Sequence, residues 1–213
     1  MISVLTGDIV SSQTLEASLL EALPSHLAGA AGLAGLSTSL EVFGGDSWQT
    51  TCHPPHSALS LAVAMRAYLL GHHGIETRIS IGVGGYDSLV TEKISLSQGE
   101  AFVLSGRALK DMPDDRRISI QLSEGFHKKD QHLLQAAVAL LDGLVAEWTG
   151  KQALAVALAH LDLPNYELAQ KVSPPISPQA FGKHLAAAKW PLIQDALSSI
   201  EHGLRDLLAE VGD

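Results

Sequence analysis

The chain has 213 residues, of which 46% are hydrophobic and 17% are charged, so it can bury a sizeable core and is not disordered. Its formal net charge of −9 argues against non-specific nucleic-acid binding, because phosphate contacts need a basic face. No window approaches the roughly 18 uncharged apolar residues of a membrane span, and the amino terminus lacks the basic start of a signal peptide, so we expect a cytoplasmic protein without membrane contacts.

The amino-terminal half predicts a β-strand, a helix and then a β-hairpin. Residues 2–9 are apolar and β-branched enough for a strand buried on both faces, and residues 14–28 carry leucines at helical spacing. Residues 37–43 and 47–52 are strand-like and are separated by Gly-Gly-Asp at 44–46, a spacing that suits a tight hairpin.

A second helix and two further strands follow the hairpin. Residues 56–70 repeat apolar positions at helical spacing, residues 77–83 are strand-like, and a helix over 99–112 precedes a strand over 117–122. The order βαββαβ predicts an antiparallel sheet with two helices on one face, which is the ferredoxin-like or palm architecture. The fold class is therefore α+β, with one domain over residues 1–125 and a helical domain over 126–213.

Two aspartates stand at the ends of predicted strands beside glycines, Asp8 after the first strand and Asp46 in the hairpin. If they converge, they can hold Mg²⁺ or Mn²⁺, because such ions take one or two carboxylates together with the oxygens of a bound phosphate. The local alternative is that Asp8 caps the following helix and Asp46 only shapes the hairpin turn.

Four stretches resemble, in the same order, the catalytic domain of class III nucleotidyl cyclases. They are 6–12 (TGDIVSS), 45–48 (GDSW), 78–84 (RISIGVG), and 99–102 (GEAF) with 105–107 (SGR). The resemblance implies that Asp8 and Asp46 bind the metal and that the segment containing Ile9, Ser11 and Ser12 wraps the nucleotide phosphates. It also implies a homodimer, because cyclase-like domains form their clefts between two subunits.

The same resemblance gives Arg107 the role of stabilising charge on the reacting phosphate, which suits a planar guanidinium. The chain departs from the cyclase pattern elsewhere. Val103 stands where cyclases have an asparagine, Leu96 stands near the adenine-selecting aspartate, and Leu40 and Val42 occupy the base-selecting lysine positions.

These departures favour nucleotide sensing over efficient cyclisation, since cyclisation needs the ribose hydroxyl held in line with the phosphate. The alternative is a divergent metal-dependent nucleotidyl cyclase or phosphotransferase that uses Asp8, Asp46 and Arg107. A third possibility is a scaffold in which both sites are vestigial.

The carboxy-terminal half predicts helices only. Residues 133–145 have a helical pattern, Thr149 is a candidate cap for a helix running to residue 160, and residues 165–172 form a short capped helix. Ser177 followed by Pro178 starts another helix, so the segment resembles a helix-turn-helix or winged-helix module with residues 178–189 as its recognition element.

In that element Phe181, Leu185 and Ala188 form the inward stripe. The candidates for DNA contact are then Gln179, Lys183, His184 and Lys189. Residues 121–213 carry 7 basic and 11 acidic side chains, a net charge of −4, so self-association or a protein partner remains an equal alternative to DNA.

Taken together, the two halves resemble the SatD-like family of small bacterial proteins, which combine a cyclase-like front half with a winged-helix-like back half. We therefore expect a nucleotide-responsive regulator whose palm-like half binds a nucleotide with Mg²⁺ and whose tail engages DNA or a protein partner.

The histidine pairs His53 with His56 and His72 with His73 invite comparison with zinc sites. The single cysteine, Cys52, is the only nearby sulfur, so solvated helix and loop ends are the preferred interpretation. For Cys52 we expect a buried, reduced thiol.

Overall fold

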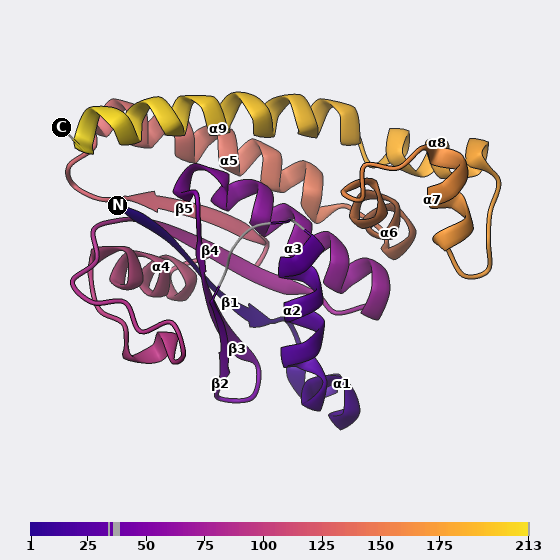
Figure 1. The fold of residues 1–213 in the computed structure, drawn as a ribbon, viewed down its shortest axis with the longest axis horizontal. Helices are drawn as coiled ribbons and strands as arrows, with labels where there is room; N and C mark the ends of the chain where they lie inside the picture. Colours follow the sequence, from indigo (N-terminus) through magenta and orange to yellow (C-terminus); the bar gives the residue numbers. More distant parts are fainter. Residues whose placement is uncertain (34, 36–38, 213) are drawn as a thin grey trace.

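The structure is a computed structural model that describes residues 1–33, 35 and 39–212. A five-stranded mixed sheet lies at its centre, in the order β2-β3-β1-β4-β5 (Figure 1). The strands are β1 (Ile2–Ile9), β2 (Leu40–Phe43), β3 (Ser47–Cys52), β4 (Thr77–Gly84) and β5 (Ile118–Leu122). Strands β1 to β4 pair antiparallel, and β5 runs parallel to β4.

Nine α-helices and three short 3-10 helices complete the described part of the chain. The α-helices are α1 (Ala17–Glu21), α2 (Leu23–Leu33), α3 (Ala58–His73), α4 (Glu100–Lys110), α5 (Lys128–Ala146), α6 (Gly150–Ala159), α7 (Asn165–Lys171), α8 (Pro178–Ala187) and α9 (Trp190–Gly212). The 3-10 helices are η1 (Ser12–Thr14), η2 (Pro55–Ser57) and η3 (Ile94–Leu96).

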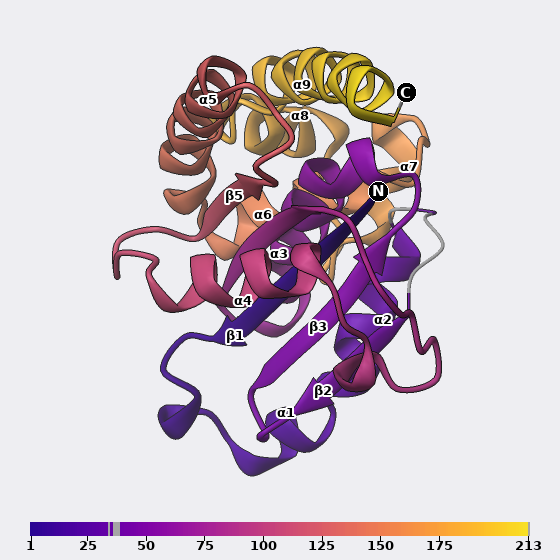
Figure 2. The same ribbon diagram turned by 90° about the vertical axis from the view of Figure 1, so that its left-hand side faces the viewer.

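The predicted order βαββαβ is confirmed by β1 to β4 and the helices between them. Helices α2 and α3 both pack in the main core on one face of the sheet, and α5 packs beside them against β5. Helix α4 covers the opposite face, where Ile2 and Val4 of β1 meet Ala101 and Phe102. Figure 2 shows these layers, with α4 and α3 on either side of β1.

Several local signals in the sequence produce the expected structure. Gly44 and Gly45 adopt positive φ angles of 63° and 94° in the hairpin turn, which glycine tolerates without strain. Thr149 and Gln152 form a reciprocal capping box at the start of α6. At α8, Ser177 accepts a hydrogen bond from the Ala180 N–H at 3.2 Å, and Pro178 occupies the first turn.

Other elements differ from the prediction. The helix predicted over 14–28 is broken into η1, α1 and α2, and Pro24 explains the second break, because proline disfavours helix at the residue before it. Part of the strand predicted over 37–43 falls on residues 37 and 38, which lie outside the described residues. Helix α9, which the sequence analysis did not predict, runs beside α5 (Figure 1).

The main hydrophobic core contains residues from both predicted domains. It unites Leu5 and Ile81 of the sheet with Val138 of α5 and Leu204 of α9. The division at residue 125 falls in the turn between β5 and α5, and it stays a prediction.

Among the described residues, no single helix is long and apolar enough to cross a membrane; α5 and α6 meet that test only as a pair, which is bent by 118°.

Candidate functional site

The two aspartates lie at the same end of the sheet. Strand register places Asp8 of β1 opposite Ser47 of β3, and the Ile9 N–H donates to the Asp46 carbonyl at 3.1 Å. Two residues that are far apart in sequence are therefore neighbours, because the hairpin brings its turn back beside the end of β1. The backbones of the two aspartates are thus close, although Asp8 does not line the hollow that Asp46 lines.

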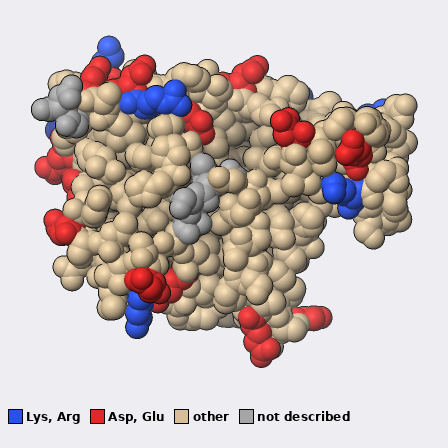
Figure 3. Space-filling view, viewed as in Figure 1, with Lys and Arg blue, Asp and Glu red and all other residues tan. Residues whose placement is uncertain are grey.

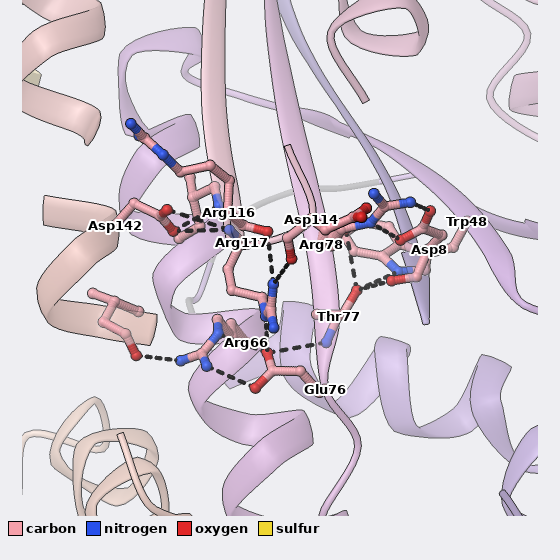
Figure 4. A network of polar contacts seen from close by, with 12 residues as sticks. Asp8, Trp48, Arg66, Glu76, Thr77, Arg78, Asp114, Arg116, Arg117 and Asp142 are labelled. Carbon is pink, nitrogen blue, oxygen red and sulfur yellow. Dashed lines mark hydrogen bonds and ion pairs between the residues drawn. The ribbon is translucent and has the colours of Figure 1, made fainter. Parts of the chain in front are cut away.

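Asp8 is held by Arg78, the residue opposite it on β4. The Arg78 Nε donates to Oδ1 at 2.9 Å and Nη2 donates to Oδ2, which makes the ion pair bidentate (Figure 4). The hydrogen bond to Asp8 raises the pKa of Arg78. A metal ion at Asp8 would therefore compete with the Arg78 guanidinium. The Asp8 side chain does not cap the helix that follows, since the N-cap of η1 is Ser11.

Asp46 carries the more available carboxylate. Its Oδ2 accepts a hydrogen bond from Ser12 Oγ at 2.6 Å, and Ser47 Oγ donates to Oδ1 at the longer distance of 3.4 Å. Asp46 and Ser12 line an open hollow of about 470 Å³ together with Gln13 and Glu21. No lysine or arginine is among the described residues that line it, so anionic phosphates would need a cation to enter.

The loop after β1, whose Ser12 and Gln13 line this hollow, contains free backbone donors. Ser11 adopts a left-handed conformation with φ 55°, and the N–H groups of Ser11, Ser12 and Gln13 donate to no acceptor in the described part of the chain. Three successive N–H groups of this kind can bind phosphate oxygens. The Ile9 N–H is not free, since Asp46 uses it, and the Ile9 side chain is buried.

Arg107 lies apart from the aspartates within one chain. It is exposed on α4 and lines a separate hollow of about 330 Å³ with Ser119 and Gln121 of β5. Its side chain makes no hydrogen bond or ion pair with the described residues. The structure therefore brings the side chains of Ser12 and Asp46 together, with Asp8 as a backbone neighbour, and it places Arg107 elsewhere.

A buried polar network centred on Arg66 lies behind the site, and the sequence analysis did not predict it (Figure 4). The Arg66 side chain is fully buried; its Nε and Nη2 donate to Glu76 at 2.8 Å each, and its Nη1 donates to the Val145 carbonyl at 2.6 Å. Glu76 in turn accepts the Val10 N–H at its carbonyl, at 2.9 Å. The network thus connects the loop after β1 with the end of α5.

Asp142 of α5 belongs to the same region and is buried. Its carboxylate accepts hydrogen bonds from the N–H groups of Arg117 at 3.1 Å and Ile118 at 2.8 Å, which fixes the start of β5. Burial raises the pKa of Asp142, and these hydrogen bonds act in the opposite direction.

The helical tail presents the predicted DNA-contacting residues as follows. Gln179, Lys183 and Lys189 are exposed, whereas His184 is half-buried. Lys189 lies beyond the end of α8, with φ 56°. The predicted inward stripe is confirmed for Phe181, which is fully buried.

The remainder of this stripe is also turned inward, with Ala188 buried and Leu185 packed against the small core of α6 to α8. On the face drawn in Figure 3, lysine and arginine side chains are scattered among acidic ones and form no continuous patch. Helix α7 begins at Asn165 without a side-chain cap, unlike the capped helix predicted there.

Of the two histidine pairs, His53 and His56 lie just before and within η2, and His72 and His73 lie at the end of α3. The His73 ring stacks on His26 of α2 with centroids 3.6 Å apart. Within the described ranges, no group of three or more His, Cys, Asp or Glu side chains is arranged to hold a metal ion. Cys52 is buried as expected, and burial together with Glu201 raises the pKa of its thiol to about 12.

Comparison with known proteins adds little to this geometry. No protein-family model and no curated protein matches the chain. Among solved structures, a bacterial light-regulated adenylyl cyclase is similar with a TM-score of 0.39 and 14% sequence identity, over 60% of this chain and 85% of that one. A score at this level carries no argument about activity, so the site rests on the strand register and contacts described above.

Proposed function

We propose that this protein is a nucleotide-responsive regulator whose amino-terminal half is a nucleotidyl cyclase-like palm. A nucleotide would bind with Mg²⁺ at the hollow beside Asp46, and the helix-turn-helix-like tail would engage DNA or a protein partner. This is the organisation that the SatD-like resemblance implies.

The observation that carries the proposal is the contact of Asp46 with Ser12 of the loop after β1, at the end of the sheet where Asp8 also lies. Asp46 suits Mg²⁺, because its carboxylate lines an open, acidic hollow and Mg²⁺ needs only one or two carboxylates beside phosphate oxygens. The ion would supply the positive charge that links the nucleotide phosphates to Asp46. The free N–H groups of Ser11 to Gln13 would donate hydrogen bonds to the remaining phosphate oxygens.

The test is a thermal-shift screen of nucleoside mono-, di- and triphosphates and cyclic nucleotides, each with and without Mg²⁺. A ligand at one hundred times its Kd stabilises the fold by about 2.7 kcal/mol, enough to raise the midpoint by several degrees. We expect a Mg²⁺-dependent rise that Asp46→Ala abolishes. Asp195→Ala, a change at an exposed aspartate of α9, is the matched control and should keep the rise.

If no nucleotide raises the midpoint, the nucleotide site is vestigial and the proposal fails. Asp8→Ala is the weaker variant for this purpose, because it leaves Arg78 without its partner and disturbs the fold as well as the site.

The regulatory part of the proposal concerns α8. We expect selection from a pool of random-sequence DNA duplexes to enrich a motif that the wild type binds and that Gln179→Ala with Lys183→Ala binds more weakly. Enrichment of no motif, with or without the nucleotide found in the thermal screen, would favour the protein-partner alternative.

A second candidate function is a divergent metal-dependent cyclase or phosphotransferase, favoured by the exposed and unpaired side chain of Arg107 within the described residues. Such an arginine can reach a substrate held by a second subunit. Incubation with nucleoside triphosphates and Mn²⁺ separates the two functions. Cyclic product or pyrophosphate that disappears in both Asp46→Ala and Arg107→Ala would establish catalysis.

A further inference from the structure

Helix α5 leaves an apolar strip uncovered. Leu133 is 60% exposed and Leu140 is 77% exposed, the highest value among the large hydrophobic side chains of the described chain. Ala136, between the two leucines, and Gly143, after the second one, are also exposed. Leu144 lies at the edge of the strip and is 40% exposed. Figure 2 shows α5 at the outer margin of the molecule, with no other helix or strand of the described residues beyond it.

The same helix face ends in opposite charges. Lys129 lies before Leu133 and Glu147 lies after Gly143, and both charged residues are exposed. Their spacings of three or four residues place them on one face of the helix. The α5 stripe is therefore defined here by six residues: Lys129, Leu133, Ala136, Leu140, Gly143 and Glu147.

The α5 stripe is symmetric about position 138. Lys129 and Glu147 are equally far from it, and so are Leu133 and Gly143, and likewise Ala136 and Leu140. If a second copy of the helix lies antiparallel across this midpoint, each leucine faces a small residue of the partner and each lysine faces a glutamate. Large side chains then fit beside small ones, and the two helices can approach closely.

We propose that the chain forms a two-fold dimer by antiparallel pairing of its α5 helices along this stripe. A two-fold interface must be complementary to itself, and the stripe meets this requirement in both size and charge. A parallel pairing would instead place Lys129 against Lys129 and Glu147 against Glu147. The proposal does not depend on the nucleotide site, because no stripe residue lines the hollow beside Asp46.

The first experiment compares the dimer dissociation constants of variants by sedimentation equilibrium. We expect the wild type to be a dimer and Leu140→Asp to weaken the dimer by about tenfold or more, since a central apolar contact is lost. Leu192→Asp is the matched control, because Leu192 of α9 is also an exposed leucine, at 59%, but lies outside the stripe. It should leave the dissociation constant unchanged.

Gly143→Leu separates the interface from the fold. A Cβ at Gly143 meets nothing within 4 Å beyond its chain neighbours and the backbone of its own helix, so the monomer should fold as well as the wild type, as judged by circular dichroism and thermal unfolding. In the dimer the new side chain would meet Leu133 of the partner subunit. We therefore expect weaker association from a fully folded protein.

A charge exchange tests the direction of pairing. Lys129→Glu and Glu147→Lys should each weaken the dimer, and the double variant should restore it, because the opposite charges again face one another. A monomeric wild type would overturn the proposal. So would a dimer that tolerates both Leu140→Asp and Gly143→Leu, and a double charge variant no better than the single ones would exclude the antiparallel register.

Discussion

At the scale of single residues, the most demanding group is the guanidinium of Arg66. It is fully buried, yet its donors reach the Glu76 carboxylate and the Val145 carbonyl. A buried charge is tolerated only when it is paired and hydrogen-bonded, and this one is. Arg66 therefore ties three separate segments of the chain to one point.

We predict that Arg66→Met lowers the free energy of unfolding by about 2–4 kcal/mol, because the Val145 carbonyl loses the Arg66 donor and Glu76 loses its closest partner, keeping a weaker contact with Arg117. Chemical denaturation with urea measures the loss. Arg107→Met is the control, since Arg107 is exposed, and it should change the stability by less than about 0.5 kcal/mol. Equal losses in the two variants would show that the buried contacts add nothing.

At the scale of elements, helices α2 and α3 meet through aromatic rings. The ring of His26 in α2 stacks on the ring of His73 in α3, and within α3 the ring centroids of Tyr68 and His72 lie 4.5 Å apart. Burial lowers the pKa of both His72 and His73, and the neighbouring His26 lowers that of His73 further. The contact between the two helices therefore favours neutral histidines.

We predict that stability falls as the pH is lowered through the ordinary histidine value of about 6.5. The pKa values of these histidines are lower in the folded state, so the unfolded chain binds protons first and gains free energy relative to the folded one. Urea unfolding at a series of pH values measures the slope. His73→Gln should flatten it, whereas His202→Gln, at an exposed position of α9, should not.

The elements differ in how much their sequences reveal. Strands β1 and β4 and helix α3 are predictable, because their apolar patterns are long and local. Pro24 indicates the break between α1 and α2, and an apolar repeat indicates α9, but the sequence analysis predicted neither feature.

Contacts across strands are different in kind. The pairing of Asp8 with Arg78 depends on strand register, and the partners of Arg66 come from two other elements. No local pattern encodes either contact. The sequence therefore predicts that the two aspartates lie near each other, but it does not show that Arg78 already forms an ion pair with Asp8.

At the scale of the whole molecule, the two halves meet most closely where α3 crosses α6. Gly71 of α3 lies against the backbone of Leu154 of α6, so closely that a Cβ at position 71 would overlap it. A glycine in a helix normally lowers stability, and this one is retained where a side chain has no room.

We predict that Gly71→Ala destabilises the protein by about 1–3 kcal/mol through overpacking, despite the better helix propensity of alanine. Gly203→Ala in α9 is the matched control, because nothing lies within 4 Å of its added Cβ. That variant should gain about 0.5–1 kcal/mol. Differential scanning calorimetry should show opposite shifts in the two midpoints.

The position of Glu76 has a mechanical consequence. Its carbonyl accepts a hydrogen bond from the Val10 N–H. Its carboxylate binds Arg66, which also donates to the Val145 carbonyl at the end of α5. If a ligand moves the loop after β1 toward Asp46, the movement can pass through Glu76 and Arg66 to the Val145 carbonyl at the end of α5. The rates of amide hydrogen exchange at Val10 and in the last turn of α5 should then change in the same direction when the ligand is added. The local stabilities of the two halves of the chain would be coupled through Glu76.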